Sequence, residues 1–437
     1  MLKEFSVNFN NLLLSLSDAI DLANPSIASH QMRTAFITWQ LANAAGLPKE
    51  RIEKLFIASL FHDIGAMSLE EKIEIHNSSI VDEENHCILS EEIFKLSHLF
   101  EPSKNIVRHH HKPWRLRDAS IQDPDAFDAQ LLYLADHIEI NIDRNQYILH
   151  QVDHLGEMVE KASGGSIHGD IVKLFHEISY REDFWLDLMS PRLYSILLHS
   201  GPFQQKMIGY DNIYSVARLF KHTIDFKSRF TATHSTGVAE CAVMISKIFG
   251  LTDLEIMQMK IAGYFHDIGK LTIPNSILEK NGKLTKEEYA IIRQHTYFTY
   301  SVLKTIGGLD HIAEWAAFHH EKLDGTGYPF HVGAGKLSIF SRIMAVSDIF
   351  TAISEDRPYR KGMERPQVEK VLISQVENSA LDRKIVHLLL DNFEEISSYV
   401  KEKQHLSRDV YNMKFSKVNF QNEPEPRSRE AEMASGR

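Results

Sequence analysis

The stretch Phe265-His266-Asp267-Ile268-Gly269 repeats a pentapeptide found earlier in the chain, Phe61-His62-Asp63-Ile64-Gly65. The same spacing of 204 residues separates His30 from His234. More histidines and aspartates follow in the same order, at spacings of 209, 210 and 212: His86, His109, His110 and Asp136 in the first copy, and His295, His319, His320 and Asp348 in the second. Chance would rarely supply five matches in register. The sequence therefore predicts a duplicated unit, with slightly longer loops in the second copy.

The segments around these motifs have helical periodicity. From Asp253 to His266 apolar residues recur every three or four positions, and the pair Thr252 and Glu255 predicts a capping box at the start. Thr285 and Glu288 predict a second capping box before the helix that carries His295, and another helix should span 233–249 and end at Gly250. Alternating strand patterns are scarce. We therefore expect an all-α protein of two tandem helical bundles.

A chain of 437 residues is too long for one compact core. Turn residues at Ser200-Gly201-Pro202 interrupt the helical pattern, so we expect an N-terminal domain over 1–200 and a second domain over 206–405. The polar segment 406–437 should be a disordered tail. The first twenty residues, with Leu12-Leu13-Leu14, predict an amphipathic helix rather than a signal sequence.

Composition limits the partners and the location. A net charge of −11 argues against a DNA- or RNA-binding surface, because phosphate backbones require clustered Lys and Arg. The two cysteines, Cys87 and Cys241, form no disulfide framework, which favours a reducing cytoplasm. No segment approaches the roughly 20 apolar residues of a membrane span.

The ordered histidines and aspartates suggest metal binding. Side chains that project from neighbouring helices can build a metal site inside a helical bundle. Imidazole supplies nitrogen, and carboxylate supplies oxygen that can bridge two cations. This mixed ligation fits iron, manganese or zinc better than calcium or magnesium. A single buried histidine is more often a hydrogen-bonded core residue, but seven such residues in one ordered set favour a metal centre.

The second copy resembles the HD-GYP phosphodiesterases of the HD phosphohydrolase superfamily. The resemblance extends from about Ile224 to Met363 and includes the run from His319 to Pro329, which reads HHEKLDGTGYP, and the run Arg357-Pro358-Tyr359-Arg360. It implies hydrolysis of a bacterial cyclic dinucleotide, either 3′3′-cyclic GMP-AMP or cyclic di-GMP. It also implies two divalent transition metals, iron or manganese, with zinc and nickel as alternatives. The first would be held by His234, His266, Asp267 and Asp348, and the second by His295, His319 and His320, with Asp267 bridging both.

The resemblance also suggests which residues contact substrate. Lys270, Arg357 and Arg360 are natural partners for the charge on the phosphodiester. A shaped loop beside them would comprise Asp324, Gly325, Gly327, Tyr328 and Pro329. The chain departs from the family at Phe230, which cannot ligate a third metal. It also departs at Thr299 and Thr351, where the family usually has Gly and Asp.

The first copy retains every ligand type, in His30, His62, Asp63, His86, His109, His110 and Asp136. It lacks the lysine, replaced by Ala66, and the loop, replaced by His111-Lys112-Pro113-Trp114. Its residues leave metal binding open, and we do not expect catalysis there. We expect a regulatory or scaffold domain, which could also mediate a homodimer or bind a signalling partner.

Two other functions remain open at this stage. A signalling module could bind a cyclic dinucleotide without hydrolysing it, but it would be expected to lose ligands in the second copy, and none is lost. An HD-type nucleotidase would act on a phosphomonoester; the loop and Lys270 favour the diester. The choice between cyclic GMP-AMP and cyclic di-GMP is not determined by any residue spacing.

Overall fold

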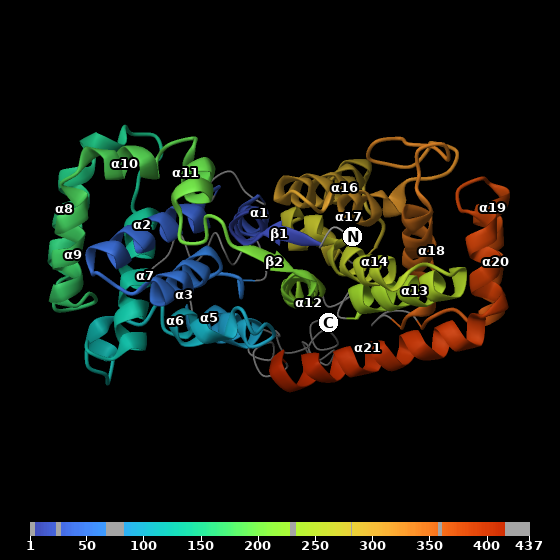
Figure 1. Cartoon of the computed structure of the whole chain (residues 1–437), viewed down its shortest axis with the longest axis horizontal. Helices are drawn as coiled ribbons and strands as arrows, with labels where there is room; N and C mark the ends of the chain where they lie inside the picture. The colour runs from blue at the N-terminus through green and yellow to red at the C-terminus, as the bar shows by residue number, and fades with distance from the viewer. Residues whose placement is uncertain are drawn as a thin grey trace, which may run out of the picture.

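The fold is almost entirely helical, as the sequence predicts (Figure 1). The computed structural model describes residues 5–22, 28–66, 83–227, 233–280, 282–356 and 361–415. Within these ranges the only sheet consists of β1 (Ser6–Asn8) and β2 (Met207–Gly209), which pair antiparallel with Val7 opposite Ile208. One strand precedes each copy of the repeat, so this small ribbon joins the starts of the two halves.

The first half forms a bundle that surrounds the first histidine set. Its α-helices are α1 (Phe9–Asp21), α2 (His30–Ala44), α3 (Lys49–Leu60), α5 (Glu83–Phe94), α6 (Lys104–Arg108), α7 (Pro124–Ile140), α8 (Val152–Ala162), α9 (Gly169–Ser179), α10 (Glu182–Leu188) and α11 (Leu193–Ser200). Short 3-10 turns lie between them: η2 (Glu101–Ser103), η3 (Trp114–Leu116) and η4 (Ile148–His150).

The second half repeats this order around the second histidine set. Its α-helices are α12 (Tyr210–Phe226), α13 (His234–Phe249), α14 (Asp253–Phe265), α15 (Asn275–Leu278), α16 (Lys286–Ile306), α17 (Asp310–Ala317), α18 (Ile339–Ser354), α19 (Arg365–Glu377), α20 (Arg383–Asp391) and α21 (Phe393–Phe415). The 3-10 turns η5 (Ile268–Thr272) and η6 (Phe318–His320) carry site residues.

The predicted helix boundaries are confirmed. Both capping boxes form, at Thr252 with Glu255 and at Thr285 with Glu288. Helix α13 ends at Gly250, whose φ of 88° lies in the left-handed region that glycine tolerates. The long helix α21 runs to Phe415, past the expected domain end at residue 405, so the first part of the predicted tail is helical. The remainder of that tail, from residue 416, lies outside the described residues.

The N-terminal segment forms the predicted helix, but most of that helix is buried. Leu12, Leu13 and Leu14 of α1 are all fully buried, although they point in different directions, and Asn11 and Asp18 are partly exposed. Helix α1 contacts α2 and α3 of its own half and also packs on α16 and η5 of the other half. It lies with α12 at the centre of the elongated molecule (Figure 1). The apolar face of α1 is therefore wider than that of a helix that packs against one domain alone.

The contacts of α1 have counterparts in the second copy. The side chain of Asn11 in α1 donates to the carbonyls of Thr305 and Ile306 at the end of α16, at 2.8 Å each. At the equivalent place, Ser215 in α12 shares a hydrogen bond of 2.9 Å with Ser97, just after α5. Each half therefore packs its first helix against the other half, and the buried apolar residues form one continuous core.

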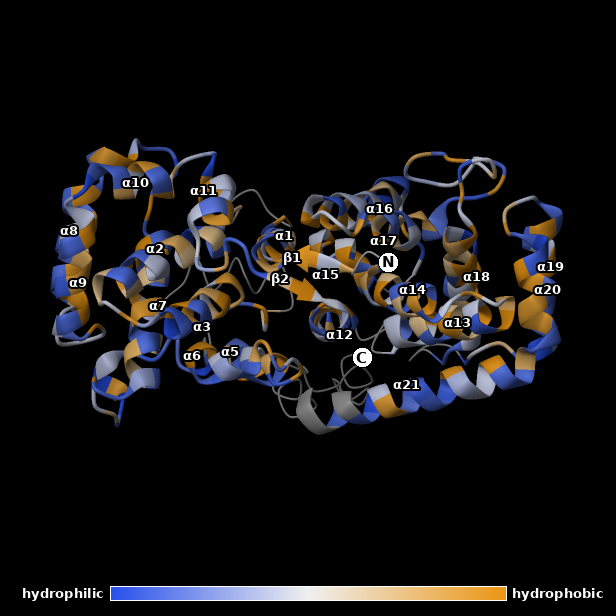
Figure 2. Ribbon diagram, viewed as in Figure 1, coloured by the Kyte–Doolittle hydropathy of each residue, from blue (hydrophilic) through white to orange (hydrophobic). Residues whose placement is uncertain are grey.

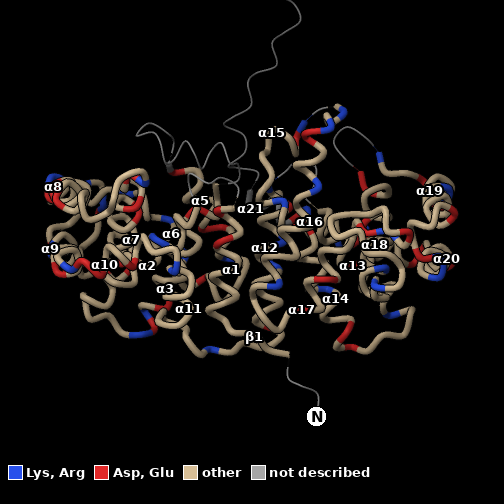
Figure 3. The backbone as a smooth tube through the Cα atoms, turned by 90° about the horizontal axis from the view of Figure 1, so that it is seen from above, with Lys and Arg blue, Asp and Glu red and all other residues tan. Residues whose placement is uncertain are grey.

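The outer helices have the expected amphipathic character. Along α21, Phe393, Ile396 and Val400 are buried at helical spacing, and Figure 2 shows blue and orange residues alternating along this helix and α8. Figure 3 shows Lys and Arg interspersed with Asp and Glu over the helices of both halves. Among the described residues, no helix is long and apolar enough to cross a membrane.

Candidate metal centres

In the second copy the predicted ligands converge from five elements. His234 opens α13, His266 and Asp267 follow α14, His295 lies in α16, His319 and His320 lie in η6, and Asp348 lies in α18. All but the partly exposed His320 are buried. The start of α13 is held by Asp225, whose Oδ1 accepts from the amide (3.2 Å) and hydroxyl (2.6 Å) of Ser235. This cap places His234 at the centre of the bundle.

The carboxylate of Asp267 lies between two groups of histidines. Its Oδ2 atom is 3.2 Å from Nε2 of His266 and 4.0 Å from Nε2 of His234. Its Oδ1 atom is 3.4 Å from Nε2 of His295 and 3.9 Å from Nε2 of His319. Each oxygen therefore faces a separate set of nitrogen ligands, as a carboxylate that bridges two cations would.

The orientation of the imidazoles also fits metal ligation. The Nδ1 atoms of three histidines, His266, His295 and His319, each donate to the carbonyl three residues earlier, at 2.8, 2.7 and 2.6 Å. A carbonyl oxygen can only accept, so Nδ1 carries the proton and Nε2 presents its lone pair to the centre. These side chains can therefore hold a metal without rearrangement.

The electrostatics keep His295, His319 and Asp267 in the protonation state that a metal requires. Burial lowers the pKa of His295 to about 3, and that of His319 likewise to about 3, so both rings are neutral at pH 7. Burial alone would raise the pKa of Asp267, but His266 and Lys270 outweigh it and hold that pKa well below its usual range. A neutral imidazole and an ionised carboxylate are the forms in which these side chains bind metal. Burial alone would lower the pKa of His234, but Glu355 and Asp348 raise it to about 10, so His234 would release a proton when a metal binds.

Glu355 is a site residue that the sequence patterns did not reveal. Its Oε1 atom lies 3.3 Å from Nδ1 of His234, and both side chains are buried. In the first copy the same role falls to Glu139, which pairs with Nδ1 of His30. Glu139 follows Asp136 by three residues, whereas the second copy has Thr351 there and supplies Glu355 one turn later. Comparing the two copies at this position could have revealed the exchange.

Thr299, which departs from the family pattern, has a structural role. Its hydroxyl donates to the His266 carbonyl (3.0 Å) and accepts from the Gly269 amide (3.1 Å). A Cβ on Gly269 would lie only 1.9 Å from the His295 carbonyl oxygen, so glycine is required where the two segments meet. Thr299 thus fixes the turn that carries His266 and Asp267 against α16.

Lys270 and the loop lie at the edge of this centre. The ammonium of Lys270 is 2.6 Å from Oδ2 of Asp267. The ring of Tyr328 lies over His320 with centroids 5.0 Å apart, and the Arg293 guanidinium lies 4.7 Å from the Tyr328 centroid. Arg293 was not predicted from the sequence.

The loop itself is held by hydrogen bonds and close packing. The buried Glu321 carboxylate accepts from the amides of Phe330 (2.7 Å) and Val332 (3.1 Å). A Cβ on Gly327 would lie 2.4 Å from Cα of Glu321, and Gly325 has a φ of 79°. Asp324 is exposed and accepts from the Thr326 amide at 2.8 Å, and the Tyr328–Pro329 peptide is cis. Tyr328 and Gly327 lie against His320, and contact of the loop with substrate stays a prediction. The remaining predicted residues, Arg357, Arg360 and Phe230, lie outside the described residues.

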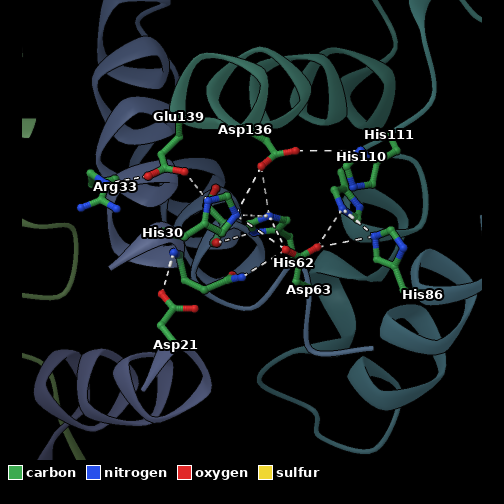
Figure 4. Close-up of polar contacts among 12 residues, drawn as sticks. Asp21, His30, Arg33, His62, Asp63, His86, His110, His111, Asp136 and Glu139 are labelled. Carbon is green, nitrogen blue, oxygen red and sulfur yellow. Dashed lines mark hydrogen bonds and ion pairs between the residues drawn. The ribbon is translucent and has the colours of Figure 1, made fainter. Parts of the chain in front are cut away.

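The first copy requires one correction. Its histidine pair is His110 and His111, which both lie in the cluster (Figure 4), whereas His109 is not among the side chains grouped closely enough to share a metal ion. The buried His110 donates from Nδ1 to the Val107 carbonyl at 2.6 Å, as His319 does to Ala316 in the second copy. His110 is therefore equivalent to His319, and these two residues are 209 positions apart, as His86 and His295 are. Three consecutive histidines made the pair ambiguous in sequence, and the prediction took the first two.

With that correction the first copy reproduces the geometry of the second (Figure 4). The Oδ2 atom of Asp63 lies 3.3 Å from His62 and 3.6 Å from His30, and Oδ1 lies 3.5 Å from His86 and 3.6 Å from His110. Asp136 likewise faces both groups, at 3.4 Å from His30 and 3.9 Å from His111. Both copies thus contain residue clusters able to hold metal ions.

Comparisons with known proteins agree with the repeat. Residues 218–385 and residues 27–141 each match a family described as HD domain. A Vibrio cholerae protein named 3′3′-cGAMP-specific phosphodiesterase 1 is 28% identical over 404 residues, which cover 89% of this chain and 93% of that protein. A cyclic di-GMP phosphodiesterase of Pseudomonas aeruginosa is 36% identical over 136 residues, covering 30% of this chain and 32% of that protein.

A solved structure shares the fold. The crystal structure of a cyclic GMP-AMP specific phosphodiesterase of V. cholerae, V-cGAP3, superposes with a TM-score of 0.62 at 20% identity. The superposition covers 89% of this chain and 98% of that one. The two-domain helical architecture therefore extends over almost the whole chain.

Proposed function

The chain belongs to the HD domain family, with two HD domains in tandem, and from this premise we propose that it hydrolyses a 3′–5′ phosphodiester bond of a bacterial cyclic dinucleotide. The observation that carries the proposal is the position of Asp267, whose two oxygens face separate histidine groups in the second domain. The relative that spans nearly the whole chain is named for the same reaction class. The product would be a linear dinucleotide.

We assign the metal ligands as the repeat suggests. His234, His266 and Asp348 with Oδ2 of Asp267 would hold one ion, and His295, His319 and His320 with Oδ1 of Asp267 the other. Histidine with carboxylate favours iron or manganese, with zinc and nickel as alternatives. Such a pair of ions, when bound, supplies an activated water and a clamp for the phosphate oxygens.

The chain's own residues orient the substrate and stabilise its charge. Lys270 is partly exposed and adjacent to Asp267, so its ammonium can also contact a phosphate oxygen as negative charge develops. Glu355 fixes the ring of His234, and Tyr328 packs on His320 and limits its motion. The first domain has Ala66 in place of Lys270, and η3 stands where the loop would be. We therefore assign catalysis to the second domain and a regulatory or scaffold role to the first.

The substrate is a cyclic dinucleotide with 3′–5′ linkages, either 3′3′-cyclic GMP-AMP or cyclic di-GMP. Cyclic GMP-AMP is the first substrate to test, because the relative of matching length is named for it. We place the enzyme in the cytoplasm as part of the proposal, since Cys87 and Cys241 are unbonded thiols. We also assign to the first domain the binding of a second copy or a signalling partner.

One experiment distinguishes this function from its alternatives. The full chain, loaded with iron or manganese, is incubated with 3′3′-cyclic GMP-AMP, cyclic di-GMP and cyclic di-AMP, and products are separated by chromatography. We expect a linear dinucleotide from the first or second substrate. Tight binding without product would identify a signalling module instead. Hydrolysis of a mononucleotide with all three cyclic substrates intact would identify a nucleotidase.

A further inference from the structure

The first domain contains a cavity of about 370 Å³ directly beside its histidine cluster. Its wall is formed by Glu84, Cys87, Arg108, His109, His111, Lys112 and Leu116. His111 belongs both to this wall and to the candidate metal cluster, and Cys87 Sγ lies 3.7 Å from Nε2 of His86. The volume is within the range of small-molecule sites, which begin at roughly 300 Å³. The cavity therefore has room for a ligand and adjoins the cluster.

At the equivalent place in the second domain, the loop packs on the corresponding histidine. There Tyr328 covers His320, the counterpart of His111. The loop is anchored by Phe318, whose ring is 5.5 Å from that of Phe330, and by Glu321, which accepts two loop amides. The first domain has His109 and Lys112 at the positions of Phe318 and Glu321. Nitrogen donors have thus replaced the loop anchors in a pocket that the missing loop leaves open.

The turn that carries these donors is built to hold its shape. The Arg117 side chain donates to the carbonyl of His109 at 2.5 Å and to that of Lys112 at 3.0 Å. Arg108 is held at 2.8 Å from Glu84 and 3.4 Å from Glu91. Three cationic side chains therefore surround one small turn, and two of them are fixed by protein contacts.

The chemistry of the wall indicates the class of ligand. Arg108 and Lys112 are charged donors suited to phosphoryl oxygens, with His109 and His111 beside them. Glu84 is the single acid on the wall, and it is already paired with Arg108. Leu116 is 60% exposed and adds an apolar surface that inorganic phosphate alone would not cover. We propose that this cavity is a second ligand site of the protein, which binds a phosphate monoester carrying an organic group.

Calorimetry on the metal-replete full chain tests the proposal. GMP, inorganic phosphate and malonate are titrated into the wild type, into Lys112→Gln, into the double variant Arg108→Gln/Lys112→Gln, and into the control Lys161→Gln on α8. We expect GMP to bind the wild type and the control at one more site than the double variant. Lys112→Gln should weaken that site roughly tenfold, which is the effect of losing one charge-assisted hydrogen bond.

A second measurement locates the bound ligand. Cys87 is 3% exposed and lines the cavity, so an alkylating reagent must reach it through the cavity, whereas Cys241 is fully buried in α13 and serves as an internal reference. GMP should slow the alkylation of Cys87 by N-ethylmaleimide, followed by peptide mass spectrometry, in the wild type and not in the double variant. Unchanged GMP binding and unchanged Cys87 protection in the double variant would overturn the proposal. If malonate bound as tightly as GMP, the site would not be specific for phosphate. If inorganic phosphate bound as tightly as GMP, Leu116 would not contact an organic group of the ligand.

Discussion

The carboxylate of Glu355 lies 3.3 Å from the ring nitrogen of His234 that faces away from the centre of the site. Gln404 of α21 donates to the other carboxylate oxygen of Glu355 at 3.1 Å, so the last helix of the chain supports a ligand at the start of α13. An acid in this position orients the ring and increases its basicity as a ligand. We therefore expect that loss of this contact lowers the affinity for metal as well as the stability of the fold.

Glu355→Gln should lower metal affinity and kcat by roughly 10- to 100-fold, the usual effect of losing an outer partner of a histidine ligand. The measurement is metal content after dialysis against graded chelator, together with initial rates at saturating metal. Glu314→Gln on α17 is the control. A Glu355→Gln protein with the metal affinity of the wild type would show that the acid only fills space.

Asp267→Asn should abolish turnover, while Asp63→Asn should retain most of it. Asp267 is the carboxylate shared by the two histidine groups of the second domain. Its replacement should therefore lower the rate by more than the roughly 100-fold expected for an outer partner of a histidine ligand, such as Glu355. Asp63 has the same position in the domain that lacks Lys270 and the loop. Rates of cyclic dinucleotide hydrolysis and thermal unfolding are measured for both. Equal losses of activity in two folded variants would contradict the division of labour.

Thr299→Val should destabilise the protein by about 1–3 kcal/mol, because the buried His266 carbonyl and Gly269 amide both lose their partner. Thr299→Ser should remain close to the wild type, since Ser90 makes the same two hydrogen bonds in the first domain, at 2.7 and 3.0 Å. The measurement is the denaturation midpoint in urea. Thr305→Val, on the same helix and exposed, is the control.

The metal-free protein should lose stability as pH falls below about 6.5, in part through His295. Burial lowers the pKa of His295 in the folded state to about 3, whereas the unfolded chain takes up a proton near the ordinary histidine value of 6.5. Between these values the unfolded state binds more protons, so acidification favours unfolding by up to about 1.4 kcal/mol per pH unit for this group. His295→Gln should therefore show a shallower decline in its urea midpoint from pH 6.5 to pH 4. If the urea midpoints of His295→Gln and the wild type declined in parallel, the pH dependence would come from groups other than His295.

Much of the fold and of the second site could be predicted from sequence because the information is local. Capping boxes, Gly250 and the spacing of apolar residues determine helix ends over a few positions. The repeated His-Asp pentapeptide relates the two halves, and its Asp267 does lie between two histidine groups. Chemistry that depends on residue type and order within one helical turn is visible in the sequence alone.

The errors came from contacts between distant segments. Glu355 reaches His234 from another helix, and Arg293 reaches Tyr328, so neither has a signature near its partner in sequence. The register of His110 and His111 depends on where α6 ends, which three successive histidines do not reveal. The extent to which α1 is buried depends on the other half of the molecule, which covers its second face.

The reciprocal packing of α1 and α12 has a consequence for how the chain can be divided. Equivalent positions make the two contacts, as the same patch does on both partners of a two-fold dimer. The peptide link between the halves makes their association intramolecular, with an effective concentration on the order of millimolar or more. Dilution therefore cannot separate the halves. A second domain produced without the first would lack the helix that its neighbour contributes, so we expect its stability and activity to depend on the fused pair.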